Sequence, residues 1–248
     1  MKFRCSSIGK LMADAVSIDD DLITPEIKKI IDSKKRTDEE KALITDLKNK
    51  TLSVGAKTYI RELAAQEIFG VDFQISSKAI EKGIEVEEES IQLLNRVRGL
   101  SLKKNTERRS NDFITGECDL FDSHIKRGHD IKSSWSIQTF PILVTDCEDK
   151  LYEWQMRGYM ALWDAEEWEV NYCLVDTPDR LIGFDNMELH YVSHIPEHMR
   201  VTTWTVKRDL EKEAAIFEKV KVAREYFKSV IAEFDQTHAM NMALRKAA

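Results

Sequence analysis

The chain has 248 residues, of which 42% are hydrophobic and 33% are charged, a composition typical of a soluble globular protein with a core. No apolar run is long enough to span a bilayer and the first residues lack the pattern of a signal peptide, so we expect a cytoplasmic protein without membrane attachment. Four cysteines without a CxxC pair argue against a zinc knuckle, an iron–sulfur cluster and a disulfide framework, whereas the net charge of −7 argues only weakly against nucleic acid, because acids around a metal site contribute to it.

The N-terminal part of the chain is predicted to be helical. Residues 14–50 form its most polar stretch, for which we expect short, mostly exposed helices or a mobile excursion. A helix is predicted over residues 54–69, with Gly70 as its stop. A second helix is predicted over residues 79–97 and is ended by Gly99.

Strand-like runs come next, at residues 100–106, 112–122 and 128–135. A polar turn around Lys126 joins the last two runs, as in a β-hairpin. The remaining elements are a helix at 148–163, a strand at 167–175 and a long charged amphipathic helix from about 207 to 234.

This order of elements predicts an α/β (α+β) fold in which helices flank a central mixed β-sheet. We expect a single domain over residues 1–248. Its parts are a helical N-terminal region, a core with the element order αβββαβ and a C-terminal extension that holds the long helix, at residues 1–78, 79–176 and 177–248.

One carboxylate projects from the apolar face of the 79–97 helix. Ile84 and Ile91 belong to the inward stripe of this helix, and Glu87 lies between them on that stripe. A buried acid is costly unless it is paired, hydrogen-bonded or bound to a metal. Glu87 therefore either reaches water at the edge of the stripe or has such a partner.

Charged residues of the hairpin share a face. Alternation along a strand puts Asp130 and Lys132 on one face, to which the adjacent strand can add Asp119. Together with Glu87, the two aspartates make a hard oxygen site suited to Mg²⁺ or Mn²⁺. A lysine beside such a metal can orient or deprotonate a water, as metal-assisted hydrolysis of a phosphodiester requires. The alternative is a surface hairpin with cross-strand salt bridges, and Glu117 is either a further ligand or a charge at the rim.

Two other segments carry polar residues that could serve such a site. Gln155 and Tyr159 are four residues apart and share the inward face of their helix, so Gln155 bonds either a core carbonyl or a nucleotide. Near the N-terminus, Ser6 or Ser7 is either a helix N-cap or, with Arg4, a contact for phosphate at a helix start.

Taken in order, these motifs resemble those of the PD-(D/E)XK nuclease superfamily. They are Gly83-x-x-x-Glu87, Gly116-x-x-Asp119, Asp130-x-Lys132 and Gln155-x-x-x-Tyr159. The helix–strand–strand–strand–helix–strand order is similar to the restriction-endonuclease-like core of that superfamily. Within it, the chain looks like the lambda-exonuclease or YqaJ-type phage recombination nucleases, over most of residues 1–176.

The resemblance implies roles for five catalytic residues. Asp119 and Asp130 would be ligands of Mg²⁺ or Mn²⁺, with two ions expected, and Glu87 would support the metal directly or through water. Lys132 would act on the attacking water. Gln155 would help to position that water or the substrate.

DNA contacts are implied for four residues. Ser7 and Arg4, with Ser6 beside them, would contact the DNA backbone or a terminal phosphate. Tyr159 would face the DNA as the helical companion of Gln155.

The resemblance also implies an activity and partners. Similar enzymes are metal-dependent deoxyribonucleases that digest one strand of linear double-stranded DNA from its 5′ end and leave 3′ single-stranded overhangs. They assemble as ring-shaped trimers and work with a single-strand annealing protein. The expected partners are therefore double-stranded DNA ends, an annealing protein and further copies of the chain, in the host-cell cytoplasm if the chain is phage-encoded.

Three alternatives stay open. A PD-(D/E)XK endonuclease of restriction or repair type would need a recognition region, which residues 14–50 or the C-terminal helix would have to provide. A non-catalytic DNA-binding assembly subunit is disfavoured, because all the charged motif residues are present. A helical interaction protein would act through residues 207–234.

Overall fold

The computed structural model describes the backbone of residues 1–73 and 76–247, and the chain divides into two compact units. One unit consists of Met1, Ser7–Phe73 and Glu211–Ala248, and the other of Lys2–Ser6 and Gln74–Leu210. Within the described residues, no helix is both long and apolar enough to cross a membrane.

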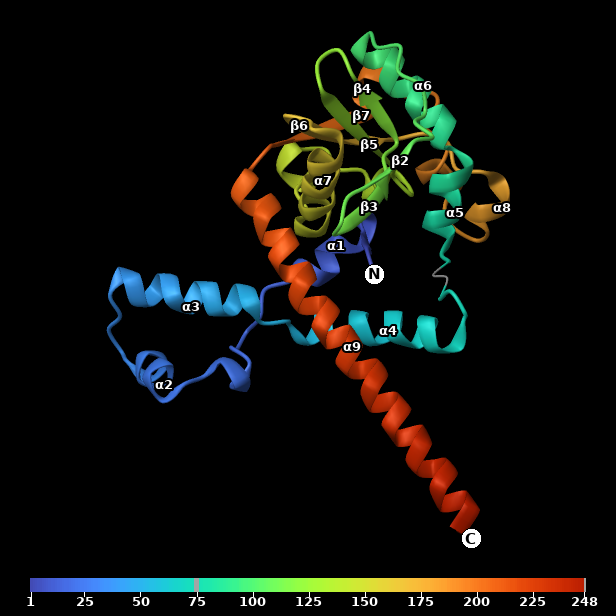
Figure 1. The fold of residues 1–248 in the computed structure, drawn as a ribbon. Coiled ribbons are helices and arrows are strands. Elements are labelled where there is room, and N and C mark those ends of the chain that lie inside the picture. The colour runs from blue at the N-terminus through green and yellow to red at the C-terminus, as the bar shows by residue number, and fades with distance from the viewer. Residues whose placement is uncertain (74–75, 248) are drawn as a thin grey trace. The chain divides into compact units, whose positions relative to one another are not determined.

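Figure 1 shows the elements along the chain. The helices are α1 (Cys5–Met12), α2 (Pro25–Asp32), α3 (Asp38–Lys50), α4 (Val54–Phe69), α5 (Lys78–Glu85), α6 (Glu87–Arg98), α7 (Lys150–Trp163), α8 (Asp179–Ile182) and α9 (Leu210–Ala247). The strands are β1 (Phe3–Arg4), β2 (Arg108–Ser110), β3 (Ile114–Glu117), β4 (Leu120–Asp122), β5 (Arg127–Ser133), β6 (Glu167–Cys173) and β7 (Val201–Lys207). The predicted fold class is confirmed: helices flank mixed β-structure, and a long helix ends the chain.

The first unit is helical, and its helices begin and end at residues that suit helix ends. The side chain of Ser53 caps the start of α4, and Gly70 ends this helix in the left-handed conformation with φ of 64°. The predicted helix at 54–69 is thus confirmed. The polar stretch at 14–50 holds the expected exposed helices, α2 and α3, and Thr37 caps the second of them in a capping box.

Apolar side chains of α1, α3, α4 and α9 supply the core of this unit. The buried residues include Ile8, Leu11, Leu47, Ala56, Ile60, Ile216 and Val220. Lys219 of α9 is also buried, and its Nζ donates a hydrogen bond of 2.8 Å to the backbone O of Thr51. Burial without such a partner would be costly, so this bond fixes α9 to the segment that joins α3 and α4.

Two hydrogen-bonded sheets form the β-structure of the second unit. Their strand orders are β1-β3-β2 and β4-β5-β6-β7. In the four-stranded sheet, β5 and β6 are parallel, whereas β4 and β7 run antiparallel to their neighbours. The chain passes from the first sheet to the second at Cys118 and Asp119, between β3 and β4.

Helices α6 and α7 pack on opposite faces of the four-stranded sheet. On one face of β5, Ile131 packs against the apolar cluster that contains Leu93 and Leu94 of α6. On the other face, Asp130 accepts a hydrogen bond from Gln155 of α7. Because neighbouring residues of a strand point to opposite faces, the two helices lie on either side of β5.

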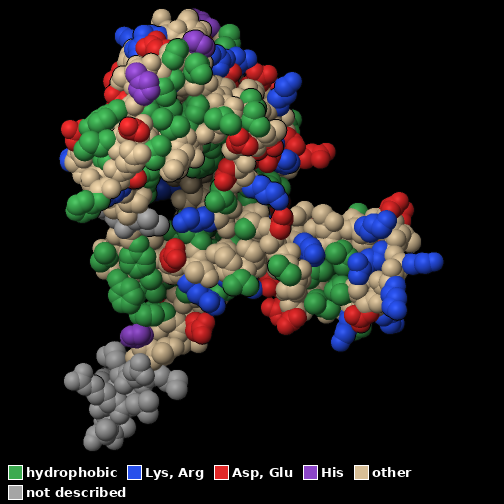
Figure 2. All heavy atoms as spheres, turned by 180° about the vertical axis from the view of Figure 1, so that it is seen from behind, with side chains coloured by type: hydrophobic (Ala, Val, Ile, Leu, Met, Phe, Trp, Pro, Cys, Tyr) green, Lys and Arg blue, Asp and Glu red, His purple; other side chains and the backbone are tan. Residues whose placement is uncertain are grey.

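The surface charge is mixed on the face of the molecule that Figure 2 draws. Figure 2 shows Lys and Arg side chains interspersed with Asp and Glu side chains over the face that it draws. The net charge of −7 therefore does not make this face uniformly acidic.

Two of the predicted strand runs are wrong. The run at 100–106 forms no strand, because Leu102 bonds through both its backbone N and O to the side chain of Asn95 in α6. The strand begins instead at Arg108. The run at 112–122 is two strands that belong to different sheets.

Two helix boundaries also differ from the prediction. The helix predicted at 79–97 is divided into α5 and α6 at Val86, whose φ of −102° and ψ of 14° are not helical. Lys207, the predicted start of the long helix, is the last residue of β7, and α9 begins at Leu210. Strands β1 and β7 were not predicted, and both lie at the edges of their sheets.

Candidate active site

Asp119 and Asp130 lie together in the structure. Asp130, in β5, is only 2% exposed. Asp119 lies between β3 and β4, and its Oδ2 accepts a hydrogen bond of 2.6 Å from the backbone N of Ile131, the residue after Asp130. The passage of the chain between the two sheets thus sets one carboxylate against the strand that carries the other.

Lys132 projects from the same face of β5 as Asp130. Its Nζ lies 2.6 Å from Oδ2 of Asp130 and 4.4 Å from the centre of the Tyr152 ring. Burial lowers the pKa of Lys132, but the charge of Asp130 and the hydrogen bond with it outweigh burial, so the pKa is raised. The lysine is therefore held as an ammonium ion beside the carboxylate.

Gln155 and Tyr159 extend this cluster from α7, as their spacing predicts. The Nε2 of Gln155 donates to Oδ1 of Asp130 at 3.2 Å and to the hydroxyl of Tyr159 at 3.3 Å. That hydroxyl donates to the backbone O of Glu117 at 3.1 Å. Asp130 is thus held at both oxygens, by Gln155 on one side and by Lys132 on the other.

Glu87, the first residue of α6, is a half-buried carboxylate that forms an ion pair with Lys104. It belongs to the same electrostatic cluster, since its charge contributes to raising the pKa of Asp119. Lys104 lies in the irregular segment before β2 and carries no motif. Sequence reasoning therefore missed the residue that holds Glu87.

The two aspartates repel each other when both are charged. Burial is the largest cause that raises the pKa of Asp119 from 3.8 to about 7, and the charge of Asp130 is the next. The amide of Ile131 and the charge of Lys132 oppose this rise without cancelling it. In the absence of a bound cation, the ammonium of Lys132 offsets only part of the repulsion between the two acids.

This donor set fits a hard divalent cation. Two carboxylates that repel each other suit Mg²⁺ or Mn²⁺, because these ions prefer oxygen ligands and their charge offsets the repulsion. In the described part of the chain, no three acidic, histidine or cysteine side chains are grouped so that they could hold a metal ion. Asp119 and Asp130 are the available pair, and Glu87 is turned to Lys104.

A pocket of about 150 Å³ adjoins Tyr159 of this cluster. Its lining residues are Arg4, Cys5, Ser6, Arg108, Thr115, Gly116, Glu117 and Tyr159. The carboxylate of Glu117 is exposed and pairs with Arg108 at 3.1 Å, so Glu117 is a charge at the rim. The pocket brings together three of the four residues predicted to contact DNA, and Ser7 is not among its lining residues.

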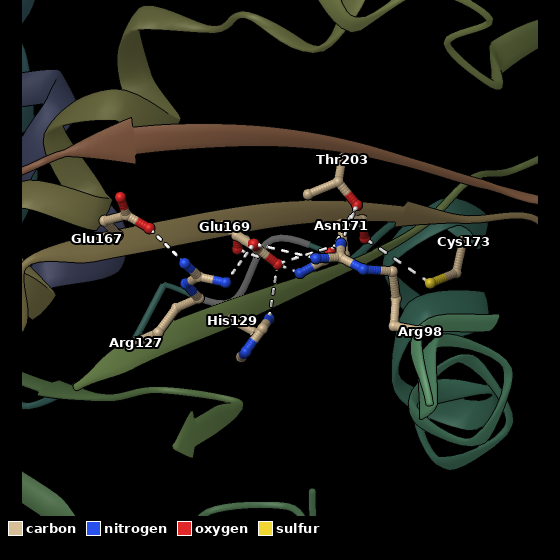
Figure 3. Close-up of polar contacts among 8 residues, drawn as sticks. All are labelled: Arg98, Arg127, His129, Glu167, Glu169, Asn171, Cys173 and Thr203. Atoms are coloured by element: carbon tan, nitrogen blue, oxygen red, sulfur yellow. Dashed lines mark hydrogen bonds and ion pairs between the residues drawn. The ribbon is translucent and has the colours of Figure 1, made fainter. Parts of the chain in front are cut away.

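A second polar network lies on the other face of β5. Figure 3 shows His129, next to Asp130 in sequence, pointing to Glu169 of β6, with Nδ1 3.1 Å from Oε2. Glu169 also pairs with Arg98 of α6 at 3.3 Å and with Arg127 of β5 at 3.4 Å. These contacts tie β5 to β6 and α6 from behind, and so restrain the strand that carries the acid and the lysine.

Solved structures of exonucleases are similar to this chain. A phage-related exonuclease from Haemophilus somnus 129PT has 34% sequence identity and a TM-score of 0.78, and the match covers 94% of this chain and 96% of that one. An alkaline exonuclease, LHK-Exo from Laribacter hongkongensis, has 14% identity and a TM-score of 0.61 over 96% of this chain and 94% of that one, a likeness that shows the fold. No family model and no curated protein matches the chain.

Proposed function

The chain belongs to the lambda-exonuclease-like phage exonucleases of the PD-(D/E)XK superfamily, and from this premise we propose that it is a Mg²⁺- or Mn²⁺-dependent DNA exonuclease. It digests one strand of linear double-stranded DNA from the 5′ end and leaves a 3′ single-stranded overhang. The 34% identity over nearly the whole of both chains supports the nuclease class, and the residues of the site support the chemistry.

The observation that carries this proposal is the position of the Asp130–Lys132 pair. A surface ladder of salt bridges would be exposed to water. Asp130 is instead 2% exposed and is bonded by Gln155 from a helix that packs on the sheet. A charged pair that is held in this way, next to a second acid at Asp119, is typical of a reactive site.

Asp119 and Asp130 would hold the metal, and two ions would occupy the site. A bound Mg²⁺ or Mn²⁺ stabilises charge on the phosphoryl oxygens and lowers the pKa of a bound water. Supporting this role, the pKa of Asp119 is raised to about 7, chiefly by burial and then by the charge of Asp130, so added positive charge would favour its ionised form.

Lys132 acts on the charge and on the proton of the attacking water, and Gln155 holds the carboxylate of Asp130 in position. With its proton, Lys132 stabilises the negative charge that develops on the phosphate, and without it the amine accepts a proton from the attacking water. A divalent cation bound by the nearby acids would lower the pKa of Lys132. The neutral amine would then be available to accept the proton. Gln155 keeps the carboxylate of Asp130 oriented through the bond from its Nε2 to Oδ1.

The pocket beside Tyr159 receives the terminal phosphate of the DNA. Arg4 and Arg108 contribute positive charge to it, and Ser6 contributes a hydroxyl. Guanidinium groups bind phosphate in a fixed geometry, which would set the 5′ end at a constant distance from the metal site. A trimer that encloses the DNA and a partner that anneals the overhang complete the proposal, by resemblance to the phage recombination enzymes.

Linear and covalently closed circular duplexes of the same sequence test this proposal. With Mg²⁺ or Mn²⁺ we expect nucleotides to be released from the linear DNA while the circular DNA stays intact. Cleavage of the circle would make the chain an endonuclease. Binding of both DNAs without cleavage would make it a non-catalytic subunit. Light scattering on the purified protein tests the trimer separately.

A further inference from the structure

Lys104 and Glu87 form a contact that the proposed mechanism does not use. Nζ of Lys104 is paired with Oε2 of Glu87, and the side chains are 49% and 23% exposed. The acid lies at the start of α6 and is the third predicted metal ligand. The ammonium of Lys104 is thus paired with the carboxylate of Glu87, at the edge of the proposed metal site.

The segment that carries Lys104 is fixed against the site. The backbone N of Asn105 donates to the backbone O of Asp119 at 2.7 Å, and the side-chain amide of Asn105 donates to the backbone O of Cys118 at 3.1 Å. These bonds hold the residue after Lys104 beside the residue that would bind metal. The side chain of Lys104 is 49% exposed, so it can leave Glu87 without giving up a buried position.

We propose that Lys104 is an internal counter-cation, which pairs with Glu87 while no divalent ion is bound, leaves it when the ion binds, and then contacts a phosphate of the DNA. This inference rests on the proposed function and adds a residue role to it. It links metal binding to DNA binding through one side chain.

The physical reason lies in the competition between two cations. A divalent ion beside Asp119 attracts the carboxylate of Glu87, directly or through water, and repels the ammonium of Lys104. Exposed ion pairs are weak, so the divalent ion wins this competition. The released ammonium is then close enough to Asp119 to interact with its charge, beside the place where a phosphodiester must bind.

Calorimetry of Mn²⁺ binding to the full-length protein without DNA tests the first step. Lys104→Gln removes the competitor, and we expect it to tighten Mn²⁺ binding about three- to tenfold. Lys103→Gln removes the same charge one residue away. Lys103 is exposed, and in the described part of the chain it forms no ion pair, so this change should alter the affinity less than about twofold. In a Glu87→Gln background, Lys104→Gln should have an effect of less than about twofold, which reflects only its longer-range interaction with Asp119.

Unchanged or weaker Mn²⁺ binding by Lys104→Gln overturns the proposal. Equal tightening by Lys103→Gln overturns it as well, since a general loss of positive charge would then be sufficient. If the wild-type protein binds no Mn²⁺ at all, the proposed function fails instead, and the two failures are thereby distinguished.

The salt dependence of DNA binding tests the second step. In a Lys132→Ala background, which leaves the DNA undigested, Lys104→Gln should reduce the slope of log K against log salt by about 0.9 with Mg²⁺ present, as expected for one lost phosphate contact. With EDTA the reduction should be less than about half of this, because Lys104 is then held by Glu87. An equal reduction in both conditions, or none in either, contradicts the proposal.

Discussion

The ammonium of Lys132 and the carboxylate of Asp130 lie 2.6 Å apart on one face of β5, and the other oxygen of Asp130 is bonded to Gln155. One residue separates the acid and the lysine in sequence, so the strand itself brings them together. Loss of either partner leaves the other charge in the sheet without its counterion. The site therefore depends on both charges at once.

In the metal-free protein, Asp119 is expected to lower stability as the pH rises from about 4 to about 7. Its pKa is raised from 3.8 to about 7 in the folded state, so in this window the folded state holds a proton that the unfolded state has lost. Asp119→Asn cannot ionise, so it does not lose stability in this way. The free energy of unfolding of the variant minus that of the wild type, measured by urea denaturation, should therefore increase between about pH 5 and about pH 7.5, on the order of 2 kcal/mol.

The exposed Asp72→Asn serves as the control for this pH dependence and should follow the wild-type profile. A constant difference between Asp119→Asn and wild type across the window would mean that Asp119 is not held protonated. Added Mg²⁺ at about pH 7.5 should stabilise the wild type and have little effect on Asp119→Asn.

Alanine substitutions at two motif glycines, Gly116 and Gly83, should change the free energy of unfolding in opposite directions. A Cβ on Gly116 would lie 2.7 Å from Cε1 of Tyr159 and 3.0 Å from Sγ of Cys5, both of which are buried. Gly116→Ala should therefore lower the free energy of unfolding by about 1 to 3 kcal/mol. A Cβ on Gly83, within α5, meets nothing within 4 Å, so Gly83→Ala should raise it by about 0.5 to 1 kcal/mol. Urea midpoints of the two variants decide this, and equal destabilisation would contradict it.

Gln155→Ala should reduce activity strongly while the protein remains folded. It removes the bond to Oδ1 of Asp130 and the contact with Tyr159, so the carboxylate loses its orientation. We expect the rate of DNA digestion to fall about 10- to 100-fold and Mn²⁺ binding to weaken. The exposed Gln138→Ala should leave both unchanged. A wild-type rate for Gln155→Ala would show that Asp130 needs no support from α7.

Lys82 is a buried lysine whose role is structural. Its Nζ donates to the backbone O of Ser134, Val175 and Trp135 at 2.7, 2.9 and 3.1 Å, and so fixes α5 to the ends of β5 and β6. Lys82→Met leaves these carbonyls without a donor and should cost about 3 kcal/mol of the free energy of unfolding. Lys78→Met, on the exposed start of the same helix, should cost less than about 0.5 kcal/mol. Similar values for the two variants in urea would refute this role.

The sequence predicts the centre of the site well because periodicity determines it. Alternation along β5 places Asp130 and Lys132 on one face, and a spacing of four residues places Gln155 and Tyr159 together on α7. The structure has both arrangements. Glycines at helix ends, such as Gly70, likewise mark boundaries that local chemistry determines.

Features that depend on distant parts of the chain could not be predicted. Lys104 lies in a segment without periodicity, and its pairing with Glu87 exists only once α6 has packed on the sheet. The pattern around Leu102 predicts a strand, but the backbone N and O of Leu102 are hydrogen-bonded to the side chain of Asn95 instead of to another strand. Strand β1 has two residues, too few for a pattern, and pairs with β3 across about a hundred residues of chain.

The most direct test is digestion of linear duplex DNA labelled on the 5′ or the 3′ end, by wild type and by Lys132→Ala. With Mg²⁺ or Mn²⁺, we expect the wild type to release the 5′ label first and EDTA to abolish release. Lys132→Ala should be slower by a factor of about 10³ or more, while Lys126→Ala, at the exposed turn of the same hairpin, should keep the wild-type rate. A wild-type rate for Lys132→Ala, or no release by the wild type with either metal, would contradict the assignment of the active site.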